Sequence, residues 1–167
     1  MTNTTRLLLL AATLSLAACG FHLRGSDLKG MQFAFKSLYL KRSGETPFVS
    51  DLRRALTSSK VTMTEKPDQA ELVLEVVSEQ TAKQILSLSG SGRVKEYQLF
   101  YRVSLRAYDS QQNDWLQSEE IVLSRILPYD DEQVFAKEQE ESLLYKDMRV
   151  DAVAQAMRRL SRAKPQL

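Results

Sequence analysis

The chain of 167 residues carries 23 Lys and Arg against 21 Asp and Glu, a formal net charge of +2, and 43% of its residues are hydrophobic. This length suits one domain rather than two, and the composition excludes a disordered chain. The near balance of charge gives no indication of a nucleic-acid partner, and no internal repeat is present.

The first 18 residues have the layout of a secretory signal. Arg6 is their only charge, and an apolar run that begins at Leu7 ends in small residues. A charged, then apolar, then small-residue order is that of a signal peptide, whereas a membrane-spanning helix needs roughly 20 apolar residues. We therefore expect export and removal of residues 1–18, which leaves 22 Lys and Arg (23 minus Arg6) against 21 Asp and Glu.

Cys19 is the only cysteine of the chain, and an unpaired cysteine in an exported protein calls for an explanation. The stretch Leu16-Ala17-Ala18-Cys19 resembles the bacterial lipobox, in which the thiol is thioether-linked to diacylglycerol. The resemblance implies a mature N-terminus at Cys19, and two or more acyl chains anchor a protein firmly. Gly20 in place of Asp favours the outer membrane. The alternative is an ordinary signal peptide whose cleavage leaves a free thiol.

Catalysis and metal binding are not indicated. A catalytic thiol needs a histidine base, and the only histidine, His22, lies three residues from the anchored terminus. One histidine and a blocked sulfur cannot supply the three or four ligands of zinc. Triad and phosphate-loop motifs are missing, and the cluster Glu138, Glu140 and Glu141 is interpreted as a solvated helical face. We expect no enzyme, no catalytic residue, no metal and no cofactor beyond the covalent lipid on Cys19.

The body of the chain begins with a strand and a short helix. Residues 33–40 are predicted to be extended, with imperfect alternation. Thr46 as N-cap and Pro47 at the first helical position open a helix, and apolar residues recur at three and four spacing over 48–56. Residues 61–64 resume an extended pattern.

Three longer extended stretches dominate the middle of the chain. Residues 70–88 begin with a run of β-branched side chains. After the turn at residues 89–92, residues 93–109 alternate cleanly, so that apolar side chains share one face and polar ones the other. Residues 115–127 return after a second polar turn. Two hairpins of this kind predict an antiparallel core.

The last predicted element is a long helix. Asp130-Asp131 is expected to cap it after Pro128, and it runs to about Arg162 with acidic residues early and basic residues late, which suits the helix dipole. Its expected apolar stripe contains Phe135, Leu143, Leu144, Met148, Ala152, Val153, Ala156, Met157 and Leu160. The fold class is therefore a two-layer α+β sandwich, in which two helices pack on a four-stranded sheet that is mainly antiparallel or mixed.

Three motifs together are similar to those of the LptE family of lipopolysaccharide-assembly lipoproteins. They are Cys19-Gly20-Phe21-His22-Leu23-Arg24, Glu96-Tyr97-Gln98, and Ala136-Lys137 followed by acidic residues. The order of elements matches across almost the whole mature chain. The resemblance implies a signal peptide at 1–18, a lipidated linker at 19–32, one LptE-like domain at 33–162 and a short tail at 163–167.

The resemblance further implies an outer-membrane lipoprotein, anchored on the periplasmic side, that sits as a plug inside the LptD β-barrel. There it would support assembly of the barrel and bind lipopolysaccharide during its delivery to the outer leaflet. The candidate residues for that contact are Lys137, Arg93, Lys95 and Lys83, because charge-assisted bonds to phosphate are the strong ones. The alternatives are ordinary solvated charges at these positions, and another envelope-assembly or cell-wall-binding outer-membrane lipoprotein.

Overall fold

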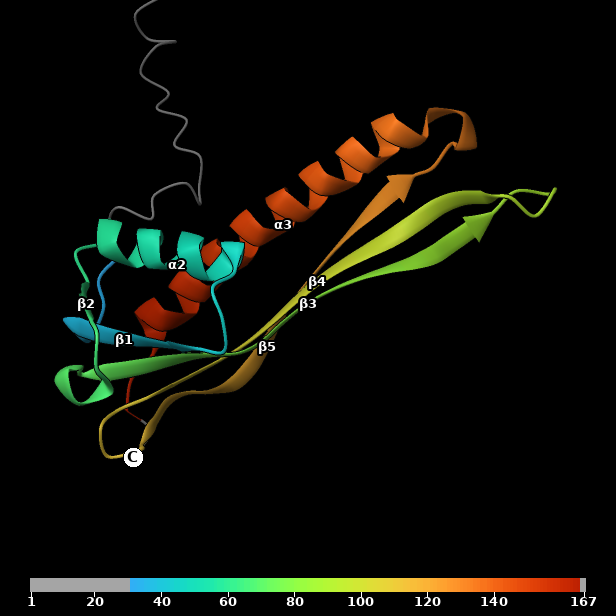
Figure 1. Cartoon of the computed structure of the whole chain (residues 1–167). Helices are drawn as coiled ribbons and strands as arrows, with labels where there is room; N and C mark the ends of the chain where they lie inside the picture. Colours follow the sequence, from blue (N-terminus) through green and yellow to red (C-terminus); the bar gives the residue numbers. More distant parts are fainter. Residues whose placement is uncertain (1–30, 166–167) are drawn as a thin grey trace, which may run out of the picture.

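Three long strands set the shape of the molecule. The computed structural model describes residues 31–165, and within them β3 (Leu72–Leu88), β4 (Val94–Tyr108) and β5 (Asp114–Pro128) pair antiparallel. β1 (Ser37–Arg42) and the short β2 (Thr62–Thr64) add parallel neighbours, in the order β2-β1-β3-β4-β5. The long strands run far past β1 to form an arm (Figure 1).

Both long helices lie on one face of the sheet. α2 (Pro47–Ser58) covers the compact end, whereas α3 (Val134–Arg162) runs from the arm back to α2 (Figure 1). Two 3-10 turns, η2 (Pro67–Gln69) and η3 (Asp131–Gln133), complete the elements. No helix within residues 31–165 is long and apolar enough to cross a membrane. The α+β class with two helices is confirmed.

The expected number of four strands is wrong, because the sheet has five, whereas its mixed pairing was allowed for in the prediction. The additional strand, β2, lies in the stretch 61–64 that was predicted to be extended, and it pairs with β1 over three residues. β1 also begins at Ser37 rather than residue 33, since the backbone N–H of Lys36 donates to the Glu71 carboxylate at 2.8 Å. The predicted signal, Cys19 and nearly all of the linker lie outside the described residues.

The core is built on β4, whose predicted alternation is confirmed. Leu99, Val103 and Leu105 are fully buried on the face beneath the helices. Against them pack Leu52 of α2 and Met157 of α3. Burial of each such side chain contributes about 1.5–3 kcal/mol, so this face holds both layers together.

Leu144 and Tyr145 in the first half of α3 are partly buried against the core, but only the second half of the helix has buried side chains. Its buried residues are Met148, Ala152, Val153, Ala156, Met157 and Leu160. Phe135 and Leu143, which were expected in the apolar stripe, are 83% and 60% exposed, so that expectation is wrong for them. Their helical spacing is right, but α2 does not reach the first half of α3 (Figure 1).

The start of α3 also differs from the predicted cap. Asp130 caps as expected, but it accepts the Glu132 N–H at 3.0 Å and thereby begins η3, not α3. α3 itself starts at Val134 without a side-chain cap. The chain therefore enters α3 through the 3-10 turn η3 and not directly from the Asp130 cap.

Substitutions at the two ends of the expected α3 stripe test which end of the helix contributes to the core. We expect Met157→Ala to lower the free energy of unfolding by about 2–5 kcal/mol, because the residue is fully buried. Phe135→Ala is expected to change it by no more than about 0.5 kcal/mol, as at other exposed sites. Urea unfolding followed by circular dichroism measures both, and equal losses would contradict the exposure of Phe135.

Candidate functional site

The four candidate cations come from three elements at one end of the molecule. Lys83 lies on β3, Arg93 and Lys95 lie at the tip of the β3–β4 hairpin, and Lys137 lies in the first turn of α3. The hairpin tip and the start of α3 both lie at the far end of the arm (Figure 1). The structure therefore gathers these residues at one end, but gives them different surroundings.

Lys83 points from β3 toward α3 and is already paired. Its Nζ atom lies 2.6 Å from Oε2 of Glu141 and 4.2 Å from the centre of the Tyr97 ring. Burial alone would lower the pKa of Lys83, but the hydrogen bond to Glu141 and the negative charge of that carboxylate outweigh it and raise the pKa. Lys83 is therefore a charged link between the two layers.

Lys137 is also neutralised within the chain. Its Nζ atom lies 2.8 Å from Oε2 of Glu140, one turn along the same helix, and its side chain is only 18% exposed. An incoming anion would have to compete with Glu140. Fully exposed pairs on helices contribute only about 0.3–0.5 kcal/mol, whereas this pair is partly buried and therefore less screened by water.

Arg93 and Lys95 are the exposed cations of the set. Neither side chain has an ion pair or hydrogen-bond partner in the part of the chain that the structure describes. The turn beside them is nevertheless ordered by its backbone, because the Ser89 N–H donates to the Arg93 carbonyl at 2.7 Å and the Gly92 N–H to the Ser89 carbonyl at 2.9 Å. Gly92 has a φ of +80°, which glycine adopts without strain.

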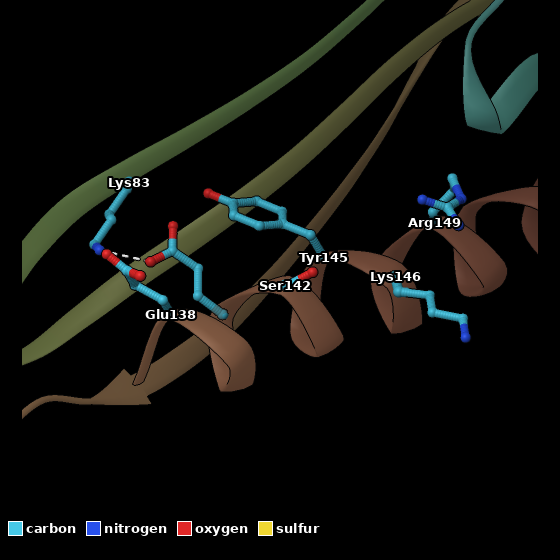
Figure 2. Close-up of a pocket in the computed structure, with 7 residues that line it drawn as sticks. Lys83, Glu138, Ser142, Tyr145, Lys146 and Arg149 are labelled. Atoms are coloured by element: carbon cyan, nitrogen blue, oxygen red, sulfur yellow. Dashed lines mark hydrogen bonds and ion pairs between the residues drawn. The ribbon is translucent and has the colours of Figure 1, made fainter. Parts of the chain in front are cut away.

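A polar groove lies between β3 and the first half of α3 (Figure 2). It has a volume of about 680 Å³ and is lined by Lys83, Glu138, Glu141, Ser142, Tyr145, Lys146 and Arg149. The Tyr145 hydroxyl donates to the Ala82 carbonyl at 3.1 Å. This bond and the Lys83–Glu141 pair form a polar latch that holds the helix on the arm where it has no buried side chains.

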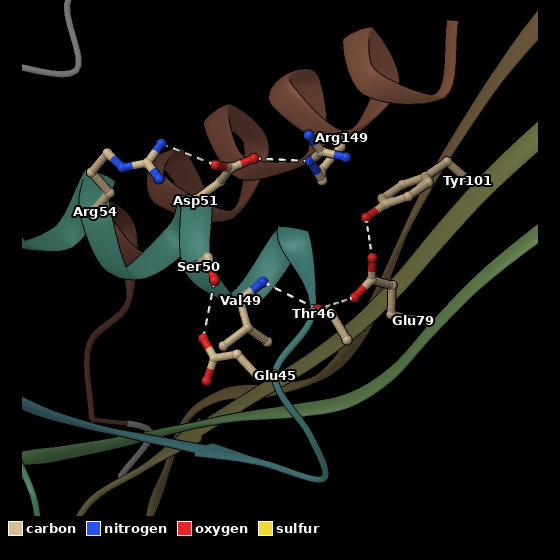
Figure 3. Close-up of polar contacts among 9 residues, drawn as sticks. All are labelled: Glu45, Thr46, Val49, Ser50, Asp51, Arg54, Glu79, Tyr101 and Arg149. Carbon is tan, nitrogen blue, oxygen red and sulfur yellow. Dashed lines mark hydrogen bonds and ion pairs between the residues drawn. The ribbon is translucent and has the colours of Figure 1, made fainter. Parts of the chain in front are cut away.

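The inner end of the groove continues into a network at the junction of arm and core (Figure 3). There the Arg149 guanidinium pairs with Asp51 of α2 at 2.9 Å. Glu79 of β3 accepts two hydroxyl bonds, one from Thr46 and one from Tyr101, each at 2.5 Å. Burial, and next the bond to Glu79, raise the pKa of Tyr101 far above its usual range.

The same network confirms the predicted start of α2. The Thr46 hydroxyl accepts the Val49 N–H at 3.3 Å while Pro47 occupies the first helical position. The Thr46 hydroxyl therefore accepts a hydrogen bond that caps α2 and donates another to Glu79. The arm is fixed to α2 by polar groups, one of which is the hydroxyl of Tyr101, whose ring belongs to the apolar core.

This end of the molecule combines exposed and paired charges. Within residues 31–165 no group of three or more His, Cys, Asp or Glu could hold a metal ion. What the arm offers is two unpaired cations at its tip and two that Glu140 and Glu141 neutralise. The glutamates were interpreted as a solvated face; Glu140, 43% exposed, agrees with that interpretation, whereas Glu141, 23% exposed and paired with β3, does not.

Four aromatic and acidic partners were not predicted from sequence as site residues. Glu141, Tyr97, Tyr129 and Tyr145 surround Lys83 or close the latch. Tyr97 belongs to the Glu96-Tyr97-Gln98 motif, and this motif was the one feature of the sequence that could have indicated any of the four as a site residue. Glu141 and Tyr145 reach this region only when α3 folds back over β3, whereas Tyr129 follows β5 and lies beside the Tyr97 ring.

The comparison with known families agrees with this fold. The LptE family model, described as lipopolysaccharide-assembly, matches residues 34–160. The chain belongs to the LptE family. LptE proteins are lipopolysaccharide-assembly lipoproteins without enzymatic activity or cofactor, and this chain is a non-enzymatic, cofactor-free lipoprotein of that kind.

Solved structures of lipoproteins share the LptE-like architecture. An uncharacterized lipoprotein B from Nitrosomonas europaea is 38% identical, with a TM-score of 0.72, over 85% of this chain and 90% of that one. The rare lipoprotein B from Shewanella oneidensis is 27% identical, with a TM-score of 0.64, over 72% and 92%. A minor lipoprotein from Acinetobacter baumannii, 24% identical with a TM-score of 0.66 over 81% and 99%, shares the fold. The comparison with curated proteins gave no match.

The polar latch predicts uneven dynamics along α3. We expect amide hydrogen exchange to be faster over residues 134–147 than over 148–160, because the buried side chains begin at Met148. Glu141→Gln is expected to accelerate exchange in the first segment only, as measured by mass spectrometry.

Glu138→Gln is the matched control, because Glu138 lines the same groove without an ion pair among the described residues. Equal exchange in the two variants would show that the Lys83–Glu141 pair does not hold the helix.

Proposed function

We propose that this LptE-family lipoprotein is anchored to the outer membrane through Cys19, plugs the LptD β-barrel, supports its assembly and binds lipopolysaccharide at the tip of its arm. The family match supports the assembly role. The observation that carries the lipopolysaccharide contact is the pair of unneutralised cations, Arg93 and Lys95, at the end of an ordered hairpin.

The tip has the properties that a phosphorylated lipid requires. Arg93 supplies a planar guanidinium and Lys95 a mobile ammonium, and both make strong charge-assisted bonds to phosphate. Their lack of internal partners means that no ion pair must be broken first. Exposed apolar side chains lie nearby, since Ile85 and Leu88 of β3 are 58% and 55% exposed.

Lys137 and Lys83 form a second tier of this site. Each can turn to a ligand only by leaving a glutamate, Glu140 in one case and Glu141 in the other. Release of Lys83 would also remove one bond of the polar latch. Ligand contact is therefore expected first at the hairpin and then at the start of α3.

The plug role is supported by the polarity of the exterior. No fully buried polar or charged residue is found among residues 31–165, so the charged side chains of the described domain face outward. A barrel interior is polar as well, and a charged, hydrogen-bonding surface suits it. Lipid chains at Cys19 would hold the domain at the membrane.

Capture from membranes tests the partner and the anchor together. With a C-terminal affinity tag on the full chain, we expect an outer-membrane β-barrel of the LptD type to be recovered in stoichiometric amount. Mass spectrometry of the mature N-terminal peptide is expected to show acyl chains on Cys19, and Cys19→Ser to remove them. Recovery of a different envelope complex would refute the plug assignment.

Charge reversal tests the lipopolysaccharide contact. In soluble protein that begins at residue 20, Arg93→Glu with Lys137→Glu is expected to weaken lipopolysaccharide binding by at least about tenfold, because two phosphate contacts become repulsive. Added salt is expected to weaken wild-type binding as well. Surface plasmon resonance measures both effects.

The control is Arg54→Glu with Lys60→Glu, which makes the same change in net charge at exposed positions beside α2. If this control weakens binding equally, the contact is non-specific electrostatics. If neither variant weakens it, the named cations do not form the site.

A further inference from the structure

One surface of the arm is uncovered and nearly free of charge. Both helices lie on the opposite face of the sheet (Figure 1). The register forms three cross-strand rows over β3, β4 and β5, here called the neutral face: Gln80, Arg102 and Val122; Ala82, Phe100 and Ser124; Gln84, Gln98 and Ile126. Arg102 is the single charge among these nine residues.

The composition of the neutral face differs from that of an ordinary solvated sheet surface. Val122 and Ile126 are 49% and 53% exposed, and the Phe100 ring lies 5.3 Å from the Arg102 guanidinium carbon. A sheet face that meets water is normally polar and often charged. Depletion of charge together with an aromatic residue and an arginine at the centre is the pattern of protein interfaces.

The compact end of the same sheet face gives an internal comparison. There Lys41 pairs with Glu75 at 3.0 Å, and Arg106 pairs with Asp114 at 2.8 Å. Glu75 also stands opposite both Lys41 and Arg106 in the register. Every charge of that row is therefore balanced within the chain.

Arg102 has no such balance. No carboxylate pairs with it anywhere in residues 31–165, and its Nε atom is shielded from water without a hydrogen-bond acceptor. Its direct neighbours across the strands are Gln80 and Val122. A half-buried guanidinium is costly without an acceptor. Glu120, which stands opposite Ser104 in the next row, forms no ion pair with it, and this leaves Arg102 available to a partner from outside residues 31–165.

The chemistry of the face selects the kind of partner. Lipid tails do not fit, because the glutamines and Ser124 need hydrogen-bond partners that tails lack. A second copy docked by the same patch about a two-fold axis would bring no carboxylate to Arg102, because none of the nine residues is acidic. A protein surface with neutral polar side chains around one carboxylate satisfies every group.

We propose that the neutral face rests against the inner wall of the barrel and that a carboxylate of that wall pairs with Arg102. This proposal depends on the plug role proposed above. Nine residues are fewer than the roughly 20–30 per side of a standard interface, so the neutral face is the centre of a wider contact. Arg102 and Phe100 are its anchors, as buried Arg and aromatic residues are elsewhere.

Charge reversal in the full, tagged chain tests this proposal in membranes. Arg102→Glu is expected to lower recovery of the barrel by at least about tenfold relative to wild type, because a charge pair at an interface centre becomes repulsive. Arg54→Glu is the matched control on α2, where the side chain is 76% exposed, and is expected to recover as much barrel as wild type. Unchanged recovery with Arg102→Glu overturns the proposal.

A second measurement does not depend on the folding of that variant. A photoreactive amino acid at Val122 or Ser124 is expected to cross-link to the barrel, at a peptide containing Asp or Glu, whereas one at Arg54 is not. When that Asp or Glu of the barrel is replaced by Arg, the Arg102→Glu chain is expected to recover the barrel again. Cross-links from Val122 and Ser124 only to lipopolysaccharide, to a second copy or to nothing overturn the proposal.

The two proposals fail differently. If the wild-type chain recovers no barrel, the plug role fails and this inference fails with it. If wild type recovers the barrel while Arg102→Glu and the Val122 cross-linker give negative results, only the neutral face is refuted and the plug role stands.

Discussion

The structure depends on the burial of one face of β4. This strand is paired on both sides, with β3 and with β5, and its Leu99, Val103 and Leu105 carry α2 and α3. Because strand side chains alternate, burial of this face commits the opposite one to the exterior. The helical layer and the uncovered neutral face are thus two consequences of a single alternation.

The arm follows from a mismatch of lengths. β3, β4 and β5 continue well past the point where β1 and α2 end (Figure 1), so the apolar core stops while the sheet goes on. Beyond that point α3 is held by the Lys83–Glu141 pair and the Tyr145–Ala82 bond. Polar contacts of this kind are weak in water, and they leave the far end of the arm able to exchange internal partners for a ligand.

Charge has different roles along the arm. At the compact end, cations and carboxylates balance one another across the strands, as Lys41 does with Glu75. At the tip, Arg93 and Lys95 have no partner among the described residues, and at the centre of the neutral face Arg102 contacts the Phe100 ring but has no carboxylate partner there. Uncompensated charges at these two places are consistent with two different outside partners, a phosphorylated lipid at the tip and a protein wall along the sheet.

The sequence by itself determined the local structure: the alternation of β4, the Thr46 cap of α2, the helical periodicity of α3 and the family motifs. These depend on neighbours along the chain, and local geometry decides them. Tertiary structure decided which part of the α3 stripe is buried, why Phe135 stays exposed, that the extended stretch at Thr62–Thr64 pairs with β1 as a fifth strand, and which cations are neutralised. These depend on groups distant in sequence, such as Lys83 and Glu141, whose separation becomes 2.6 Å only when the helix folds back over the sheet.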